Sequence, residues 1–436
     1  MTRTFKYIAP LAVLMLVLAA CDAGDESPGP GASGDGELGG EISIIAVYAD
    51  AEQEAFMSMI EPWAEEHGVQ INYESTRDIN AVLTTRLAGG NPPDIAGLPG
   101  PGQMAEFARN DQLVALDDVI DLDTYRENYS DAWIELGSAD GEFVGIFTKN
   151  SVKGGIWYNP AAFEDAGYEV PEDFAGLEAL VEQIAEDGTP PWGIGLENAA
   201  ASGWPGTDWI EDFMLRQSGP DAYNQWWQGE LAWTSDEVRS AFEAFGAWAA
   251  DETYVAGGPN SALNTAFGNG GDCLFEDPPE CYLHHQASFI TSFFEDNFPD
   301  VAESGVTYDF FMMPGIEYDG VVAGGDLFGM FNDTPQARSL MQYLVTPEAQ
   351  QIWVEIGGAL SPNKGVSLDA YPDEISRRSA EALINAETVV FDASDLMPTE
   401  MNAAFWSAVL DYVQNPDNLD SILENLDAVQ EDSYGG

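Results

Sequence analysis

The alternation of strand-like and helix-like segments near the start of the chain constrains the fold more than any other feature. Residues 42–48 form an apolar run that is typical of a buried strand, and residues 69–73 alternate as a second strand. Residues 52–66 and 80–88 carry apolar side chains at helical spacing, and a third short strand follows at 94–98. This order predicts an α/β fold with a mainly parallel sheet and helices on its faces.

The rest of the chain extends the pattern. A strand is predicted over residues 321–331, and helices are predicted over residues 172–186, 208–217, 235–250, 288–298, 336–344, 347–355, 399–413 and 417–429. Ligands of such sheets bind beyond the carboxyl ends of the strands, which here are residues 48–52, 74–77 and 99–102. The sequence has no Gly-rich phosphate loop, and no cofactor is expected.

Acidic residues greatly outnumber basic ones. The 436 residues include 76 Asp and Glu against 14 Lys and Arg, a formal net charge of −62. So few basic groups exclude nucleic acid and anionic lipid headgroups as expected partners, because both require Lys and Arg to neutralise phosphate. Either the acids keep the protein soluble, in salty surroundings for instance, or they attract a cationic ligand. The 22 Phe, 16 Tyr and 12 Trp are enough core formers for a folded chain.

The N-terminal segment predicts export. An apolar run over residues 8–20 is shorter than the ~20 residues of a membrane span and is typical of a secretory signal. It ends in the sequence LAAC, which resembles a bacterial lipobox and implies removal of residues 1–20 and a lipid anchor on Cys21. The alternative is an ordinary signal peptide followed by a coincidental cysteine. Residues 21–40 are rich in Gly, Pro, Ser and acids, which predicts a flexible tether.

The two other cysteines, Cys273 and Cys281, close a short loop. An extracellular location permits a disulfide between them. A metal site is the alternative, with His284 and His285 nearby. Adjacent residues rarely point to one metal, and two thiols without further close ligands form a poor site. We therefore predict a disulfide and no metal site.

A series of short motifs occurs in the order of a known family. They are NPPDI at residues 91–95, IWYNP at 156–160, SGWPGTDW at 202–209, GGDLF at 324–328, TPEAQ at 346–350, LSPNK at 360–364, and MP at 397–398 followed by FW at 405–406. From residue 41 onward the chain resembles the extracellular solute-binding proteins, family 1, of ABC transporters, especially those that take up maltose and α-glucosides.

The resemblance implies a two-lobed periplasmic-binding-protein-like fold of type II, in which each lobe is a mainly parallel sheet flanked by helices. Sugar would bind in the cleft between the lobes, and the closed form would dock on a permease. On this pattern, one lobe comprises residues 41–150 plus 320–375, and the other comprises residues 151–319 plus 376–436.

A sugar cleft needs aromatic rings against the C–H faces of the pyranose, and carboxylates and amides that accept protons from its hydroxyl groups. The resemblance, together with positions near the ends of predicted elements, implies such contacts for Tyr48, Asp50, Tyr158, Glu197, Trp204, Asp208, Trp209, Gln286, Phe289, Gly325, Asp326 and Trp406. Phe289 stands where the family carries a stacking Trp, so weaker stacking is expected there.

Some of these residues have ordinary structural alternatives. Trp209 and Tyr158 are equally compatible with a hydrophobic core, and a core position is the alternative to stacking for Trp406. Asp208 is also suited to capping a helix N-terminus, and Asp50 is suited to a turn. Glu197 has the alternative of a solvated loop acid.

Two other functional classes remain open at this point. A secreted glycoside hydrolase would pair two carboxylates, such as Glu197 with Asp208 or Asp326. A binder of cationic ligands such as polyamines would also combine Trp with acids, and salt would weaken its binding far more than sugar binding. Lys153, near a predicted crossing segment, is interpreted as a local ion pair rather than an anion site.

We predict a carbohydrate-binding lipoprotein without enzymatic activity. It is expected to be extracytoplasmic, monomeric and held at the cell membrane by its lipid, and to deliver its ligand to ABC permease subunits.

Overall fold

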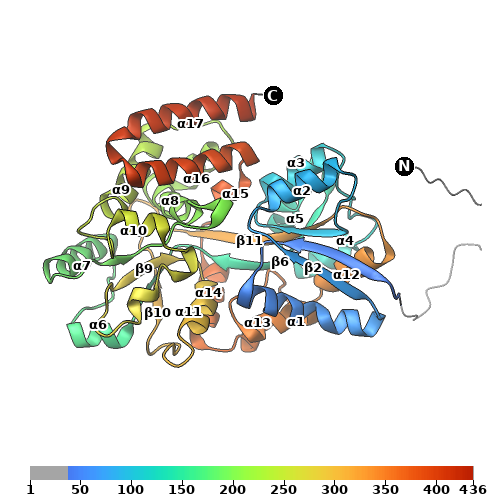
Figure 1. Cartoon of the computed structure of the whole chain (residues 1–436), viewed down its shortest axis with the longest axis horizontal. Helices are drawn as coiled ribbons and strands as arrows, with labels where there is room; N and C mark the ends of the chain where they lie inside the picture. Colours follow the sequence, from blue (N-terminus) through green and yellow to red (C-terminus); the bar gives the residue numbers. More distant parts are fainter. Residues whose placement is uncertain (1–37, 436) are drawn as a thin grey trace, which may run out of the picture. The chain divides into compact units, whose positions relative to one another are not determined.

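A computed structural model describes residues 38–435 (Figure 1). The predicted signal peptide, residues 1–20, and the predicted lipidation site Cys21 lie outside the described residues. Residues 38–40, the last of the predicted tether, belong to the folded part, because the Gly39 amide donates to the His67 carbonyl at 3.0 Å. No helix among the described residues is long and apolar enough to cross a membrane.

The larger sheet has six strands in the order β12-β11-β3-β1-β2, with β6 paired to β11. These strands are β1 (Glu41–Ala46), β2 (Gln70–Ser75), β3 (Ile95–Leu98), β6 (Gly145–Val152), β11 (Val321–Met330) and β12 (Val389–Phe391). β1 pairs in parallel with β2 and β3, which confirms the predicted parallel arrangement. β11 runs antiparallel to β3 and β6, so the complete sheet is mixed.

Helices cover both faces of this sheet because alternate side chains of a strand point to opposite sides. Ile42 and Ile44 of β1 belong to one hydrophobic cluster, and Ile45 belongs to another. The first cluster includes side chains of α1 (Asp50–His67), α12 (Pro335–Leu344) and α13 (Pro347–Ile356). The second includes side chains of α2 (Ile79–Ala88) and α3 (Pro101–Arg109) (Figure 1). Between β3 and β6 the chain also forms α4 (Leu122–Asn128), α5 (Asp131–Leu136), β4 (Ser138–Ala139) and β5 (Glu142–Phe143).

The smaller sheet has four strands in the order β10-β7-β9-β8. β7 runs antiparallel to β10 and β9, and only β8 and β9 are parallel, so the prediction of a mainly parallel sheet in each lobe is wrong here. They are β7 (Gly155–Tyr158), β8 (Trp192–Gly193), β9 (Leu283–Gln286) and β10 (Asp309–Met312). The helices around it are α6 (Pro160–Ala166), α7 (Phe174–Glu186), α8 (Trp204–Trp227), α9 (Asp236–Ala249), α10 (Pro259–Asn264), α11 (Ile290–Asn297), α16 (Thr399–Gln414) and α17 (Leu419–Tyr434). Their shared core contains Trp192, Trp209, Trp226, Trp233 and Trp248. The Trp-rich stretch from residue 192 to residue 248 therefore mainly builds hydrophobic core.

Helix α8 begins earlier than the sequence predicted. Its first residue is Trp204, and the N-cap is Gly203 rather than Asp208. The alternative that Asp208 caps this helix is therefore wrong. Gly219, with φ of 81°, kinks the helix just before Pro220.

The predicted disulfide between Cys273 and Cys281 is present. Its sulfur atoms pack against Gly193 of β8, where an added Cβ would lie 2.3 Å from the Cys273 Sγ. Glycine is required at this position because the disulfide occupies the space of a side chain.

Three connections carry the chain between the two sheet regions. Lys153 and Gly154 link β6 to β7, the segment 313–320 links β10 to β11, and α15 (Ala393–Leu396) follows β12; α14 (Glu374–Asn385) precedes β12. The buried Arg216 of α8 donates to the carbonyls of Met313 at 3.0 Å and Gly320 at 3.2 Å, so one side chain holds both ends of the second connection.

Candidate ligand-binding site

A cavity of about 340 Å³ lies beside these connections and is lined from both sheet regions. Its volume falls at the lower end of the range of about 300–1,000 Å³ for small-molecule sites. Seven of the predicted contacts line it: Tyr48, Trp204, Asp208, Phe289, Gly325, Asp326 and Trp406. The sequence distance between the first and last of these shows that tertiary packing assembles the site.

One wall of the cavity is aromatic. The ring of Trp204, at the start of α8, lies 5.2 Å from the ring of Phe267 and 6.0 Å from that of Phe289, measured between centroids. All three side chains line the cavity. Such a wall offers apolar surface to the C–H face of a flat or ring-shaped ligand.

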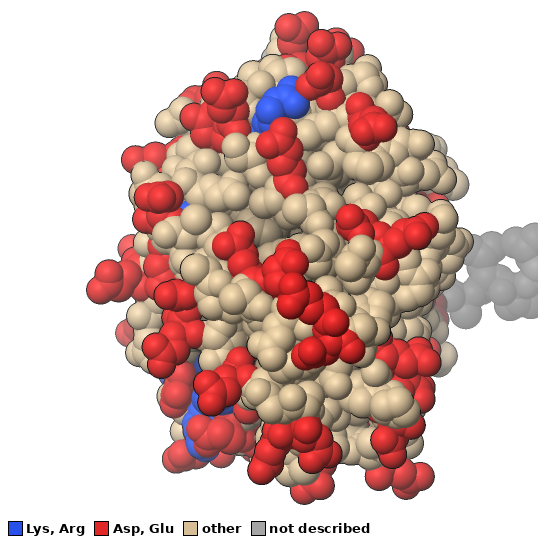
Figure 2. Space-filling model, turned by 90° about the vertical axis from the view of Figure 1, so that its left-hand side faces the viewer, with Lys and Arg blue, Asp and Glu red and all other residues tan. Residues whose placement is uncertain are grey.

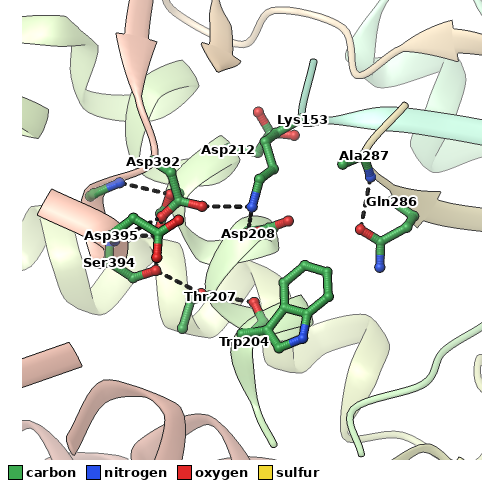
Figure 3. Close-up of polar contacts among 12 residues, drawn as sticks. Lys153, Trp204, Thr207, Asp208, Asp212, Gln286, Ala287, Asp392, Ser394 and Asp395 are labelled. Carbon is green, nitrogen blue, oxygen red and sulfur yellow. Dashed lines mark hydrogen bonds and ion pairs between the residues drawn. The ribbon is translucent and has the colours of Figure 1, made fainter. Parts of the chain in front are cut away.

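A buried ion-pair cluster stands next to this wall (Figure 3). The Lys153 Nζ lies 2.8 Å from the Asp208 Oδ1 and 2.6 Å from the Asp392 Oδ2. The same ammonium lies 5.1 Å from the centre of the Trp204 ring. These contacts confirm that Lys153 forms local ion pairs. Its ammonium group is therefore already neutralised by Asp208 and Asp392 and is not free to bind an anionic ligand.

The protonation of this cluster follows from its burial and its charges. Burial, joined by the nearby Asp392, raises the pKa of Asp208 to about 8 although Lys153 opposes the shift. Burial alone would lower the pKa of Lys153, but Asp208 and Asp392 raise it well above its usual value, so Lys153 is charged. For Asp392, burial favours the neutral acid, yet Lys153 and hydrogen bonds lower its pKa below the ordinary range.

Three carboxylates of the cluster come close enough to suggest a cation. Oxygens of Asp208, Glu211 and Asp392 all lie within 4.8 Å of one another. However, the Lys153 ammonium already bonds two of these groups. The Glu211 oxygens accept hydrogen bonds from the amides of Ala393 and Ser394, both at 3.0 Å. Lys153 and these two amides therefore already bond each of the three groups, and we assign no metal to the cluster.

A second buried lysine, Lys149, also lines the cavity. The Lys149 Nζ lies 2.6 Å from the Glu52 Oε1 and 3.5 Å from the Asp326 Oδ2. It also lies 4.8 Å from the centre of the Tyr48 ring. Burial and the charge of Asp326 raise the pKa of Tyr48 well above its usual value, so the phenol stays protonated. The chain has four lysines, and two of them line this one cavity.

Four residues that line the cavity carry buried polar atoms without a protein partner. These atoms are the Tyr48 hydroxyl oxygen, the Asp208 Oδ2, the Asn402 Oδ1 and the Trp406 Nε1. Buried polar groups are normally hydrogen-bonded, and an unpaired one costs free energy. Since both donors and acceptors are present, the set is complementary to a ligand that offers both, as a hydroxyl group does.

The other five predicted contacts do not line the cavity. Trp209 is 2% exposed and packs in the core, where its ring lies 4.3 Å from that of His285. Gln286 is buried in β9, and its Oε1 accepts from the Ala287 amide at 2.8 Å (Figure 3). Tyr158 packs against the ring of Phe163, with centroids 4.6 Å apart.

Glu197 and Asp50 also lie outside the lining. The Glu197 Oε1 accepts from the Ala199 amide at 2.8 Å and thereby supports a loop in which Ala199 has a φ of 48°. Asp50 is exposed and begins α1 with a φ of 53°, a conformation that Asp tolerates better than most residues. Because Glu197 does not line the cavity, the carboxylate pair considered for a hydrolase does not face one ligand.

Sequence reasoning missed several residues that line the cavity. These are Glu52, Arg77, Lys149, Phe267, Asp392 and Asn402 among others. The scarcity of basic residues was a usable signal for Lys149, as it was for Lys153. Arg77 follows β2 at a predicted strand end and lies 5.4 Å from the Phe267 ring. Glu52 also lies at a predicted strand end, within residues 48–52, whereas Phe267, Asp392 and Asn402 had no local signal.

Comparisons with known proteins give a consistent result. A family model described as bacterial extracellular solute-binding protein matches residues 58–380. The osmoprotective compounds-binding protein GgtB of Synechocystis is 37% identical over 417 residues, which cover 95% of this chain and 96% of the relative. The alpha-glucosides-binding periplasmic protein AglE of Rhizobium meliloti is 38% identical over 396 residues, 88% of this chain and 85% of the relative.

Solved structures agree on the fold. The bacterial solute receptor AcbH matches with a TM-score of 0.78 at 21% identity, covering 91% of this chain and 99% of the receptor. A chitin oligosaccharide binding protein matches with a TM-score of 0.78 at 17% identity and the same coverage. The predicted two-lobed fold is therefore confirmed.

Proposed function

The chain belongs to the bacterial extracellular solute-binding proteins, and from this premise we propose that it captures a carbohydrate for an ABC transporter. The ligand would occupy the cavity between the two sheet regions. The lobes would then close on it by a hinge motion, and the loaded protein would deliver it to a permease.

The main support for this proposal is that one cavity combines an aromatic wall with four buried polar atoms that have no protein partner. A pyranose has apolar C–H faces and a rim of hydroxyl groups that both donate and accept hydrogen bonds. The Trp204 ring suits the first property. Asp208, Asn402 and Trp406 supply acceptors and a donor for the second. A ligand lacking these hydroxyls would leave the buried polar atoms unpaired, which gives selectivity.

The relatives narrow the choice of sugar. One is named for osmoprotective compounds and another for α-glucosides. We therefore propose an α-glucoside or another small glycoside as ligand. A cavity of about 340 Å³ suits a ligand of a few sugar rings at most.

A cationic ligand is the second candidate, since six carboxylic residues and three basic residues line the cavity. Figure 2 shows Asp and Glu spread over one face of the molecule with very little Lys or Arg. Against this candidate, Lys149 and Lys153 already pair with four of these six carboxylic residues, namely Glu52, Asp326, Asp208 and Asp392. An amine that bound any of these four would have to displace a buried ammonium, whereas a neutral sugar would not.

The test mixes the protein that begins at Asp22 with each compound of a ligand panel. Binding is measured by the change in intrinsic Trp fluorescence and in melting temperature. The panel holds maltose, maltotriose, trehalose, sucrose, cellobiose, xylobiose, spermidine and putrescine. A saturable response to a glycoside that is recovered intact would support carbohydrate capture. A response to amines alone, abolished by salt, would transfer the proposal to a polyamine receptor. Consumption of the sugar would indicate an enzyme.

We further propose that the protein performs no covalent chemistry and works as a monomer. The relatives compared are named as binding proteins, and the carboxylate pair of a hydrolase does not face one ligand. The proposed lobes are residues 41–150 plus 320–375 and residues 151–319 plus 376–436, with the difference that β12, at Val389–Phe391, pairs with β11 and so goes with the six-stranded sheet.

Its family places the protein outside the cytoplasm, and we propose that Cys21 anchors it there by a lipid. The C21S variant would then leave the membrane fraction and appear in the soluble extracytoplasmic fraction. A variant that stayed with the membrane would contradict the lipid anchor without affecting the proposed ligand.

A further inference from the structure

Helices α3 and α16 come from opposite sides of the cavity and meet beside it. Met104 and Phe107 of α3 pack in a core of the six-stranded sheet. Phe405 and Val409 of α16 pack in the Trp-rich core of the other sheet. Figure 1 shows α15 between the two helices, and both α15 and α16 contact α3.

The approach of α3 to the start of α16 is close enough to exclude side chains. A Cβ on Gly102 would lie 2.2 Å from the Met397 carbonyl oxygen, and one on Gly100 would lie 2.6 Å from the Asp395 carbonyl oxygen. The backbone at the N-terminus of α3 therefore rests directly on the segment that leads into α16.

A single carboxylate on α3 caps α16. The Glu106 Oε1 accepts from the Thr399 amide at 2.7 Å, and the Glu106 Oε2 accepts from the Thr399 hydroxyl at 2.8 Å. Thr399 is the first residue of α16, and the N-cap Pro398 offers no side-chain hydrogen bond. The first amides of a helix need outside acceptors, and a negative charge there is favoured by the helix dipole. Glu106 supplies both the acceptor and the negative charge, although it lies 293 positions away from Thr399 in the sequence.

The capped helix carries two of the unpartnered cavity atoms. Asn402 and Trp406 both line the cavity, with the Asn402 Oδ1 and the Trp406 Nε1 left without a protein partner. Positions 399, 402 and 406 are separated by three and four residues, so they share one face of α16. The contact with Glu106 and the contacts offered to a ligand therefore lie along the same face.

We propose that Glu106 is a positioning residue for ligand binding. It holds the N-terminus of α16 against the opposite side of the cavity and so sets Asn402 and Trp406 at the distance that a bound ligand requires. This inference rests on the proposed function, because it assumes that the cavity takes a glycoside. Glu106 itself does not line the cavity.

The experiment compares Glu106→Ala and Glu106→Gln with Glu400→Ala in the purified protein. Glu400 is exposed and lies one residue after Thr399. The Glu400→Ala variant therefore removes one negative charge from the same end of α16 and is the matched control. Maltose, trehalose and sucrose are the probes. Affinity and dissociation rate are measured by stopped-flow Trp fluorescence, and the melting temperature is measured without ligand.

We expect Glu106→Ala to raise Kd by about tenfold, equivalent to about 1.4 kcal/mol, mainly through faster dissociation. Glu106→Gln keeps acceptor oxygen at one position and should recover part of the loss, while Glu400→Ala should stay within about twofold of wild type. A general structural role would instead lower the ligand-free melting temperature without rescue by Gln. That result, or a Kd for Glu106→Ala within about twofold of wild type, would overturn the proposal.

A second variant keeps the test valid if Glu106→Ala does not fold. Thr399→Val removes the hydroxyl donor alone and should raise Kd by about threefold, and unchanged binding in that variant would also overturn the proposal. Failure of the parent function is distinguishable, because the wild-type protein would then bind none of the three sugars, and this inference would fail with it.

Discussion

Replacing Lys153 with Met is the sharpest test of the ion-pair cluster beside the cavity. Met keeps an unbranched apolar stem and removes only the ammonium group, which bonds Asp208 at 2.8 Å and Asp392 at 2.6 Å. Removing one partner of a buried ion pair costs about 3–5 kcal/mol, because it leaves an uncompensated charge. The charged group left without its partner is Asp392, whose pKa lies below the ordinary range, so we expect a loss of about 3–5 kcal/mol in the free energy of unfolding.

The assay is urea unfolding followed by Trp fluorescence and circular dichroism, with the midpoint shift read at constant slope. Lys364→Met is the matched control, because Lys364 is exposed, and it should change stability by less than about 0.5 kcal/mol. Adding Asp392→Asn to Lys153→Met removes the carboxylate left unpaired and should restore at least about 2 kcal/mol.

The loss should also grow with pH. Lys153 holds the pKa of Asp392 below its ordinary range, so its removal lets burial raise that pKa. A buried carboxyl group that must be protonated in the folded state lowers the free energy of unfolding more as the pH rises above its unfolded pKa. A loss below about 1 kcal/mol, or a double variant no more stable than Lys153→Met, would refute this account of the cluster.

Three further predictions concern the ligand, pH and salt. Trp204→Ala and Trp406→Ala should each raise Kd for the bound glycoside by about 5–30-fold while unfolding stays cooperative, and unchanged affinity in both would contradict the assigned cavity. The folded-state pKa of Asp208, about 8, lies above its unfolded value of about 3.9, so its contribution to stability is complete below about pH 4 and is lost as the pH rises to about 8. Asp208→Asn should flatten the stability profile in that window, and an unchanged profile would argue against the raised pKa. Added KCl should raise the melting temperature, because salt screens the repulsion within a net charge of −62, and a flat or falling melting temperature would contradict this (Figure 2).

Helices were the most predictable part of the fold. Periodicity predicted helices over residues 347–355 and 399–413, and the structure has α13 at Pro347–Ile356 and α16 at Thr399–Gln414. Helical spacing of apolar residues and N-terminal Thr-Pro signals act within a few positions, so a single sequence contains them. The start of α8 was missed because Gly203 and Pro205 resemble a turn, although Pro also occurs in the first turn of helices.

The candidate site was only partly predictable. Strand ends indicated Tyr48, and the family motifs indicated Trp204 and Asp326, all of which line the cavity. Lys149 was missed because its partner Glu52 lies 97 positions away in sequence. Nothing local to either residue shows that pair.

The sequence by itself determined the α/β alternation, the disulfide and the acidic surface, because each depends on composition or on residues close together in the chain. Only the tertiary structure decided which side chains face the cavity. Trp204 and Trp209 lie on the same helix, yet Trp204 lines the cavity and Trp209 is buried in the core. The rotation of α8 against its sheet decides this, and that rotation is set by packing with residues far away in sequence. The contact of Glu106 with Thr399 likewise exists only once the two sheet regions have been brought together.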